Sequence, residues 1–196
     1  MRVVAIIFSA RRHGNCRDIA ERILERLQEK GIETELLMAA DYEINPCNCC
    51  SYECFYEDRR CPIDDDVPII WEKMKEADGI ALAIPSYYGL PPATFKAVIE
   101  RAQGILKWVD REIRDLEGVW RDKPIVVAVV ADGGGEMIIE HLRHLLRSAK
   151  VTLEHISHMK YGRSGFEGGL IELSEVSSKV EGLAREIYLK LVPRAS

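Results

Sequence analysis

The chain has 196 residues and a net charge of −5, with 47% hydrophobic and 30% charged residues. These values are typical of a globular protein, and the length suits one domain with a substantial core. No basic run is longer than two residues, so we expect no nucleic-acid partner. No window reaches the ~18 apolar residues of a membrane span, so we expect no membrane association. We predict a single domain over residues 1–196.

The chain begins MRVVAIIFSARR. Its apolar run of about six residues is shorter than the core of a secretory signal, so we interpret it as a buried strand and expect a cytoplasmic protein. In a reducing cytosol cysteines serve as metal ligands or catalytic groups more often than as disulfides, although hyperthermophiles are an exception.

Apolar patterning predicts strands and helices in alternation. Three nearly all-apolar runs are typical of parallel strands buried on both faces, and they lie at residues 3–8, 80–84 and 125–131. Two further strands are predicted at residues 32–37 and 151–156. Helical spacing is found between these strands and after the last, at residues 19–27, 64–79, 91–106, 136–149 and 176–191. This order predicts a three-layer α/β fold with about five parallel strands.

Open parallel sheets bind ligands at the carboxyl ends of their strands, so the loops there are the first candidates for a site. The loop after residues 3–8 leads directly into a predicted helix and contains Ser9, Arg11, Gly14, Asn15 and Cys16. A hydroxyl, a guanidinium and free amides at a helix N-terminus suit a phosphate group. A solvated turn with a basic pair explains the same residues.

The next two loops are candidates for contact with a planar ligand. The loop after residues 80–84 offers an apolar wall, with Pro85, Ser86, Tyr87, Tyr88 and Gly89. The loop after residues 125–131 is rich in glycine, which lets backbone approach a ligand closely, and contains Asp132, Gly133, Gly134 and Gly135. Packing of tyrosines at the rim and a flexible connection are the alternatives.

Five of the six cysteines lie within residues 47–61, in a segment from about residue 38 to 63 that has no helical or strand periodicity. So long an irregular connection is unusual in a compact domain unless it is functional. The spacing Cys47-x2-Cys50-x3-Cys54-x6-Cys61-Pro62 is close to, but differs from, the Cys-x2-Cys-x2-Cys-x3-Cys-Pro run of iron–sulfur proteins. We predict these four as metal ligands, with Cys49 surplus; a cluster, zinc and disulfides all stay open.

Taken together, the three loops resemble the flavodoxin-like family of NAD(P)H-dependent FMN reductases. FSARRHGNC is similar to the family's phosphate loop, commonly G-S-x-R-x-x-G-N-T, with departures at Phe8 and Cys16. IPSYYGLPPATFKAVIER is similar to the family segment P-x-Y-x-G and the helix that ends in D-R, where Glu100 replaces the acid and Arg101 matches. The resemblance implies the strand order 2-1-3-4-5 and an FMN cofactor. It also implies that the first loop holds the phosphate, that the other two flank the isoalloxazine ring, and that no side chain acts as a catalytic nucleophile or base.

The segment NPCNCCSYECFYEDRRCPIDDD resembles the cysteine insert of the iron–sulfur flavoprotein branch of this family. The resemblance implies a [4Fe–4S] cluster that relays single electrons beside FMN. It implies transfer of electrons from reduced ferredoxin or NAD(P)H to a small-molecule acceptor, in a homodimer or homotetramer.

Two other hypotheses stay open. The chain could be a zinc- or disulfide-stapled α/β binding module without redox turnover. The chain could also be a hydrolase with Cys16 as its nucleophile. Such an enzyme would need the pattern Cys-x5-Arg, and the arginine at that spacing is Arg22, which lies inside the predicted helix. His141 and His144 could share a helix face, yet no third ligand is evident nearby.

Overall fold

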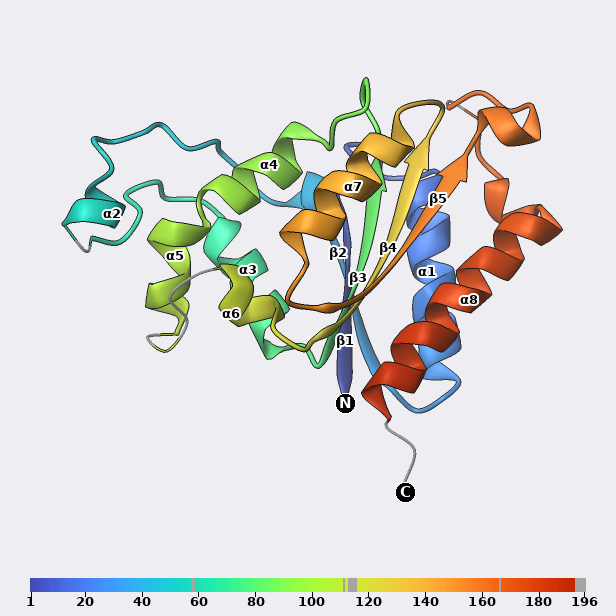
Figure 1. Ribbon diagram of the computed structural model, residues 1–196, viewed down its shortest axis with the longest axis horizontal. Coiled ribbons are helices and arrows are strands. Elements are labelled where there is room, and N and C mark those ends of the chain that lie inside the picture. The colour runs from blue at the N-terminus through green and yellow to red at the C-terminus, as the bar shows by residue number, and fades with distance from the viewer. Residues whose placement is uncertain (58, 111, 113–115, 166, 193–196) are drawn as a thin grey trace.

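A computed structural model describes residues 1–57, 59–110, 112, 116–165 and 167–192. Its centre is one parallel sheet of five strands: β1 (Arg2–Ile7), β2 (Glu33–Met38), β3 (Gly79–Pro85), β4 (Pro124–Ala131) and β5 (Lys150–Ser157). The strands lie in the order β2-β1-β3-β4-β5 (Figure 1), which confirms the predicted order and places β5 at an edge.

Each central strand is buried on both faces because helices cover the sheet from both sides. All eight residues of β4 are buried, and successive side chains enter opposite cores, as Val126 and Val127 illustrate. One face is covered by α1 (Asn15–Gln28) and α8 (Ser174–Leu191). The other is covered by α3 (Val67–Glu76), α4 (Ala93–Glu100), α5 (Ala102–Val109), α6 (Leu116–Trp120) and α7 (Gly135–Leu145) (Figure 1).

The helix predicted over residues 91–106 forms in two pieces. Helix α4 ends at Glu100 and α5 begins at Ala102, with Arg101 between them and only 2% exposed. The apolar spacing continues across this point, so the break has no signal in the periodicity. The five-residue helix α6 was not predicted either, because so short an element carries too little periodicity to be recognised.

The acidic run before α3 joins two parts of the chain. The side chain of Asp65 accepts the amide of Val67, the first residue of α3, at 3.2 Å. The side chain of Asp66 instead accepts the amide of Glu43 at 2.8 Å, and the amide of Asp66 donates to the carbonyl of Glu43 at 3.0 Å. Residues 43 and 66 are therefore held side by side.

Between these two residues lies the cysteine segment, residues 44–65. It contains the short helix α2 (Glu53–Tyr56) and extends away from the sheet beside α4 and α5 (Figure 1). Short 3₁₀ turns occur elsewhere: η1 (Ala39–Asp41), η2 (Met159–Tyr161) and η3 (Leu170–Glu172).

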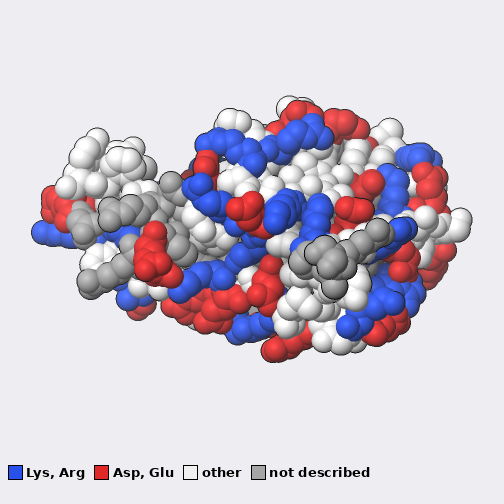
Figure 2. Space-filling model, turned by 60° about the horizontal axis from the view of Figure 1, so that its bottom comes forward, with Lys and Arg blue, Asp and Glu red and all other residues white. Residues whose placement is uncertain are grey.

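Charged side chains of both signs alternate over the face in Figure 2. None of the helices in the described residues is long and apolar enough to cross a membrane.

Candidate functional site

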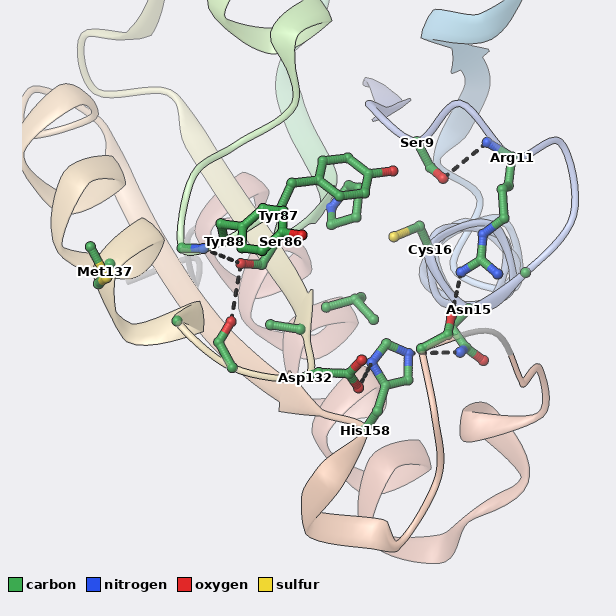
Figure 3. Close-up of a pocket in the computed structure, with 18 residues that line it drawn as sticks. Ser9, Arg11, Asn15, Cys16, Ser86, Tyr87, Tyr88, Asp132, Met137 and His158 are labelled. Carbon is green, nitrogen blue, oxygen red and sulfur yellow. Dashed lines mark hydrogen bonds and ion pairs between the residues drawn. The ribbon is translucent and has the colours of Figure 1, made fainter.

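A pocket of about 780 Å³ opens at the carboxyl ends of β1, β3 and β4 (Figure 3). This volume lies in the range of small-molecule sites. Its lining includes all but one of the residues that the sequence indicated for a cofactor: Ser9, Arg11, Gly14, Asn15, Cys16, Pro85, Ser86, Tyr87, Tyr88, Gly89, Asp132, Gly133 and Gly134. The three loops thus converge on one cavity.

The first loop leaves the start of α1 open toward the pocket. Gly14 is the N-cap of α1 and supplies no side-chain cap. The amide of Arg17 donates to the carbonyl of Gly14 at 2.9 Å, while the amides of Asn15 and Cys16 stay available to a ligand. Ser9 is 6% exposed, and its hydroxyl accepts the amide of Arg11 at 3.2 Å. The guanidinium of Arg11 donates to the carbonyl of Gly165 at 2.6 Å. A positive helix end beside a guanidinium favours an anion.

Cys16 lies at the same helix start but is only 6% exposed and packs in the core under α1. Burial raises the pKa of its thiol to about 12. A thiol of that pKa holds its proton near neutral pH, so the reactive thiolate that the hydrolase hypothesis requires is absent at Cys16.

His158 is a pocket residue that the sequence analysis missed. The side-chain oxygen of Asn15 accepts the amide of Leu170 at 3.1 Å, which fixes the orientation of the Asn15 amide. Its NH2 group therefore donates to Nε2 of His158 at 3.0 Å, and Nε2 must act as an acceptor. The proton of the neutral ring then sits on Nδ1, which lies 3.2 Å from a carboxylate oxygen of Asp132.

The second and third loops contact each other through two glycines. Gly89 and Gly134 have φ of 80° and 71°, a conformation that glycine adopts without strain. A Cβ on Gly134 would lie 2.6 Å from Cα of Gly89, so only glycine fits this contact. Ser86 ties the loops further, because its hydroxyl bonds both the carbonyl of Gly133 and the amide of Gly89 at 3.2 Å.

Gly135 is the predicted residue that does not line the pocket. It is buried at the start of α7, where a Cβ would lie 2.2 Å from Nε2 of His155. Its small size allows α7 to pack on β5. Packing therefore explains this glycine, for which the sequence had suggested contact with a ligand.

Five lining residues were not predicted: Val130, Ala131, Met137, His158 and Gly165. Val130 and Ala131 end a strand already identified, and His158 directly follows β5. Extending the rule of strand ends to the fifth strand would have found His158. Gly165 and Met137 line the pocket because the fold brings them there, and no local sequence pattern indicates this position.

The cysteines are all free thiols in the structure. Burial raises the pKa of Cys54, and the neighbouring thiols of Cys50, Cys61 and Cys47 raise it further. These are the four predicted ligands. Cys49 is exposed, and its amide donates to the sulfur of Cys47 at 3.4 Å. No three His, Cys, Asp or Glu side chains in the described part of the chain are arranged to hold a metal ion.

Backbone contacts position the cysteine segment against α4 and α5. The amide of Cys47 donates to the side chain of Glu100 at 2.7 Å, and the amide of Cys61 donates to the carbonyl of Gly104 at 2.9 Å. A Cβ on Gly104 would lie 3.0 Å from Cβ of Cys54 and 3.1 Å from Cβ of Cys61. Gly104 therefore admits two of the four cysteines to the surface of α5.

The sheet order and a pocket at the switch in strand order define a flavodoxin-like protein. A flavodoxin from Streptococcus pneumonia TIGR4 superimposes with a TM-score of 0.56 at 14% identity, covering 97% of this chain and 99% of that one. The NAD(P)H:quinone oxidoreductase from Methanothermobacter marburgensis gives a TM-score of 0.66 at 19% identity, covering 96% and 95%. At these identities the likeness concerns the fold alone.

Sequence comparison identifies the family. The sequence model of the NADPH-dependent FMN reductases matches residues 1–159. The chain belongs to this family and is an oxidoreductase of the flavoprotein class. An iron-sulfur flavoprotein of Methanocaldococcus jannaschii is 35% identical over 167 residues, which are 84% of this chain and 82% of the relative.

Proposed function

We propose that the chain transfers electrons through FMN bound in the pocket, from NAD(P)H or reduced ferredoxin to a small acceptor. The observation that carries this proposal is that the three loops which resemble those of the family converge on one cavity of about 780 Å³. The family match supports the cofactor and the type of reaction.

The first loop is proposed to hold the phosphate of FMN. The open N-terminus of α1 supplies backbone amides, and Ser9 and Arg11 supply a hydroxyl and a fixed positive charge at the same side of the pocket. Asn15 is 2% exposed and already fully engaged with its neighbours, so its role is to shape the loop. Cys16 contributes its backbone amide, since its thiol is buried.

The other two loops are proposed to orient the ring. Pro85, Tyr87 and Tyr88 form an apolar wall, and the contact between Gly89 and Gly134 lets backbone approach the ring edge. Bound FMN would supply hydride transfer and single-electron transfer. The side chains of the pocket bind and orient, and none is required as a nucleophile.

The cysteine segment is proposed to hold a [4Fe–4S] cluster through Cys47, Cys50, Cys54 and Cys61. Support comes from the spacing of these four cysteines along the sequence, from the space that Gly104 leaves for Cys54 and Cys61, and from the iron-sulfur flavoprotein relative. The amide of Cys49 donates to the sulfur of Cys47 at 3.4 Å, a type of bond that tunes such clusters. The cluster would pass electrons singly between FMN and a one-electron partner.

Tyr88 and Met137 line the pocket and are exposed, as is Leu90, which pairs with Tyr87 through the backbone. Apolar surface of this kind supports association, and we propose a homodimer or homotetramer.

Binding of FMN to purified protein tests the proposal, with Arg11→Gln and Arg12→Gln as a matched pair. Arg11 lines the pocket, while the adjacent Arg12 pairs with Asp41 on the surface. Loss of a charged hydrogen bond costs about 1.5–3 kcal/mol, so Arg11→Gln should weaken FMN binding by roughly 10- to 100-fold. Arg12→Gln should bind as the unaltered protein does. A chain that takes up no FMN, judged by its flavin absorbance after dialysis, would refute the proposal.

Iron, sulfide and zinc analysis after anaerobic purification tests the cluster. Iron and sulfide in equal amounts support it. Zinc, or cysteines joined as disulfides, would favour the alternative of a stapled binding module, which the family match disfavours.

A further inference from the structure

The first loop of the pocket is bonded through its side chains to the chain that follows β5. The guanidinium of Arg11 donates to the carbonyl of Gly165 at 2.6 Å. The NH2 group of Asn15 donates to the carbonyl of Glu167 at 2.8 Å, and its side-chain oxygen accepts the amide of Leu170 at 3.1 Å. The loop at the start of α1 is therefore held from a part of the chain about 150 residues away.

His158 is the side chain that completes the bonds of Asn15. The two backbone partners of Asn15 fix the orientation of its amide, so its second N–H donates to Nε2 of His158, 3.0 Å away (Figure 3). His158 is itself held in place, because its amide donates to the carbonyl of Ala131 at 3.0 Å and its Nδ1 lies 3.2 Å from the carboxylate of Asp132. Asn15 and His158 are both buried, so water has little access to the bond between them.

The effect of His158 reaches a ligand through the backbone of Asn15, the first residue of α1. Both N–H groups of the Asn15 side chain are engaged, so this side chain has no donor left for a ligand. The backbone amides of Asn15 and Cys16 have no partner among the described residues, and both residues line the pocket. Anchoring of the Asn15 side chain fixes the direction of these amides, and donors that are already fixed bind an anion at a lower entropic cost.

We propose that His158 is a positioning residue for a phosphate-bearing ligand: through Asn15 it fixes the two open amides at the start of α1, and the pocket thereby prefers FMN to riboflavin. The inference rests on the proposed function, in which the first loop holds the phosphate of FMN. The other partners of Asn15, at residues 167 and 170, lie beyond the family match, which ends at residue 159. The motifs of the family therefore do not account for this support.

The dissociation constants of FMN and riboflavin, measured by titration calorimetry, test the role of His158. His158→Ala leaves one N–H of Asn15 without an acceptor, so the affinity for FMN should fall by at least about fivefold. The affinity for riboflavin, which has no phosphate, should change by less than about twofold, the smallest effect of one hydrogen bond.

Two further variants separate positioning from general packing. His158→Gln keeps an acceptor near the place of Nε2 and should restore the affinity for FMN to within about twofold of the unaltered protein. His144→Ala removes an exposed histidine of α7 and should bind both flavins as the unaltered protein does. An unchanged affinity for FMN in His158→Ala, an equal loss for both flavins, or a glutamine variant as weak as the alanine variant each overturns the inference.

Hydrogen exchange of Leu170 supplies a readout that needs no flavin. Its amide is bonded to the side-chain oxygen of Asn15, so a loosened Asn15 side chain exposes it to water. This amide should exchange at least about tenfold faster in His158→Ala than in His158→Gln or His144→Ala, while amides of β4 exchange equally in all three. Equal exchange at Leu170 overturns the hold of His158 on Asn15.

The two measurements also separate failure of this inference from failure of the proposed function. A protein that binds FMN and riboflavin equally well keeps the proposed cofactor and overturns the preference for phosphate. If the unaltered protein binds neither flavin, the proposed function fails and the preference for FMN falls with it. The exchange of Leu170 then decides whether His158 holds Asn15, with faster exchange supporting it and equal exchange overturning it.

Discussion

His158 joins the first and third loops of the pocket at the level of single side chains. Its ring accepts from Asn15 on one side and faces Asp132 on the other, while only 4% of the residue is exposed. Asn15 in turn bonds the carbonyl of Glu167 at 2.8 Å and the amide of Leu170. Neutral His158 is therefore part of a buried polar network that spans residues far apart in the sequence.

Replacing His158 by alanine leaves the Asn15 amide without one acceptor, so we expect a loss of about 1–3 kcal/mol in the free energy of unfolding. The pH dependence has a definite sign. Burial lowers the pKa of His158, against a smaller opposing effect of Asp132. The stability that neutral His158 contributes is complete above its unfolded pKa, near 6.5, and is lost as pH falls through the lower folded pKa.

Urea unfolding of both proteins at several pH values between 7.5 and 5 measures this effect. The difference in stability between unaltered protein and His158→Ala should shrink as the pH falls below 6.5. A difference that stays constant across this range would mean that the pKa of His158 is the same in the folded and the unfolded protein.

Residues of the site differ in how far the sequence predicts them. Some site residues lie just after buried strands, among them Ser9, Arg11 and Tyr87. They can be predicted because ligands bind at the carboxyl ends of parallel strands. Gly135 was assigned to ligand contact because a run of glycines does not reveal which one faces a ligand. That distinction depends on His155, which reaches Gly135 only in the folded chain.

Among the elements, the second and third loops matter most for the shape of the pocket. Their contact at Gly89 and Gly134 leaves no room for a Cβ at either position, because Met137 or backbone lies within 3 Å of it. This part of the pocket wall is therefore formed by backbone, and its shape depends little on side-chain rotamers.

Gly134→Ala should destabilise the protein by at least about 1–2 kcal/mol, the cost of a left-handed conformation for alanine, with the close backbone contact adding to it. Gly133→Ala is the matched control. A Cβ on Gly133 meets nothing within 4 Å and its φ is not positive, so its stability should change by no more than about 0.5 kcal/mol. Denaturant unfolding measures both, and equal stabilities would show that the loop contact can relax.

The break between α4 and α5 shows why some elements were predicted in the wrong form. Phe95, Val98, Ala102 and Leu106 follow helical spacing without interruption, so periodicity alone predicts one helix. What ends α4 is the inward turn of Arg101, whose partners come from residues 45, 63 and 65. A contact between distant segments has no local pattern.

At the scale of the whole molecule, apolar side chains on the two faces of the sheet form two cores. The five strands and most of the covering helices could be predicted because both cores consist of apolar side chains at regular spacing. The pocket lies at the end of this framework, where three loops converge. Because these loops come together only in the folded chain, binding of FMN should stabilise the folded state.

We expect FMN at about 100 times its dissociation constant to add about 2.7 kcal/mol to the free energy of unfolding. For a chain of this size that corresponds to a rise of roughly 5–11 °C in melting temperature. Differential scanning calorimetry measures the rise, with riboflavin as the control for the phosphate contacts. An unchanged melting temperature at saturating FMN would contradict a site formed by the folded chain.

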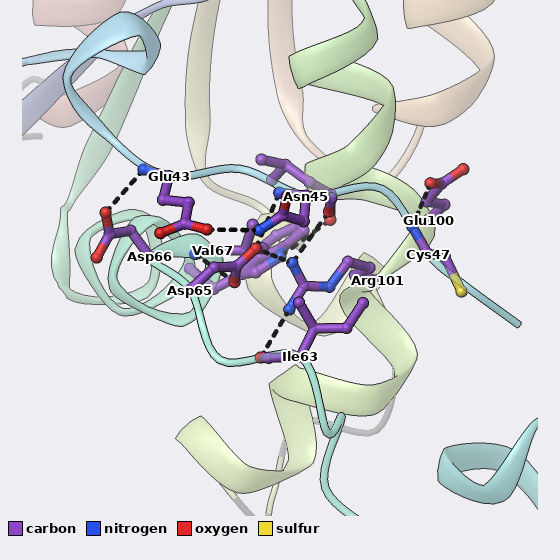
Figure 4. Close-up of polar contacts among 11 residues, drawn as sticks. Glu43, Asn45, Cys47, Ile63, Asp65, Asp66, Val67, Glu100 and Arg101 are labelled. Atoms are coloured by element: carbon purple, nitrogen blue, oxygen red, sulfur yellow. Dashed lines mark hydrogen bonds and ion pairs between the residues drawn. The ribbon is translucent and has the colours of Figure 1, made fainter. Parts of the chain in front are cut away.

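Glu43 and Asp66 are hydrogen-bonded to each other (Figure 4), so the cysteine segment between them is a loop whose two ends are held together. The sheet registers and both cores do not depend on the length of chain between these two residues. A segment of different length could therefore replace the cysteine segment between Glu43 and Asp66 while the flavodoxin-like sheet and cores stay the same. Arg101 lies outside this segment and would have to change with it, because without Asp65 its charge would be buried alone.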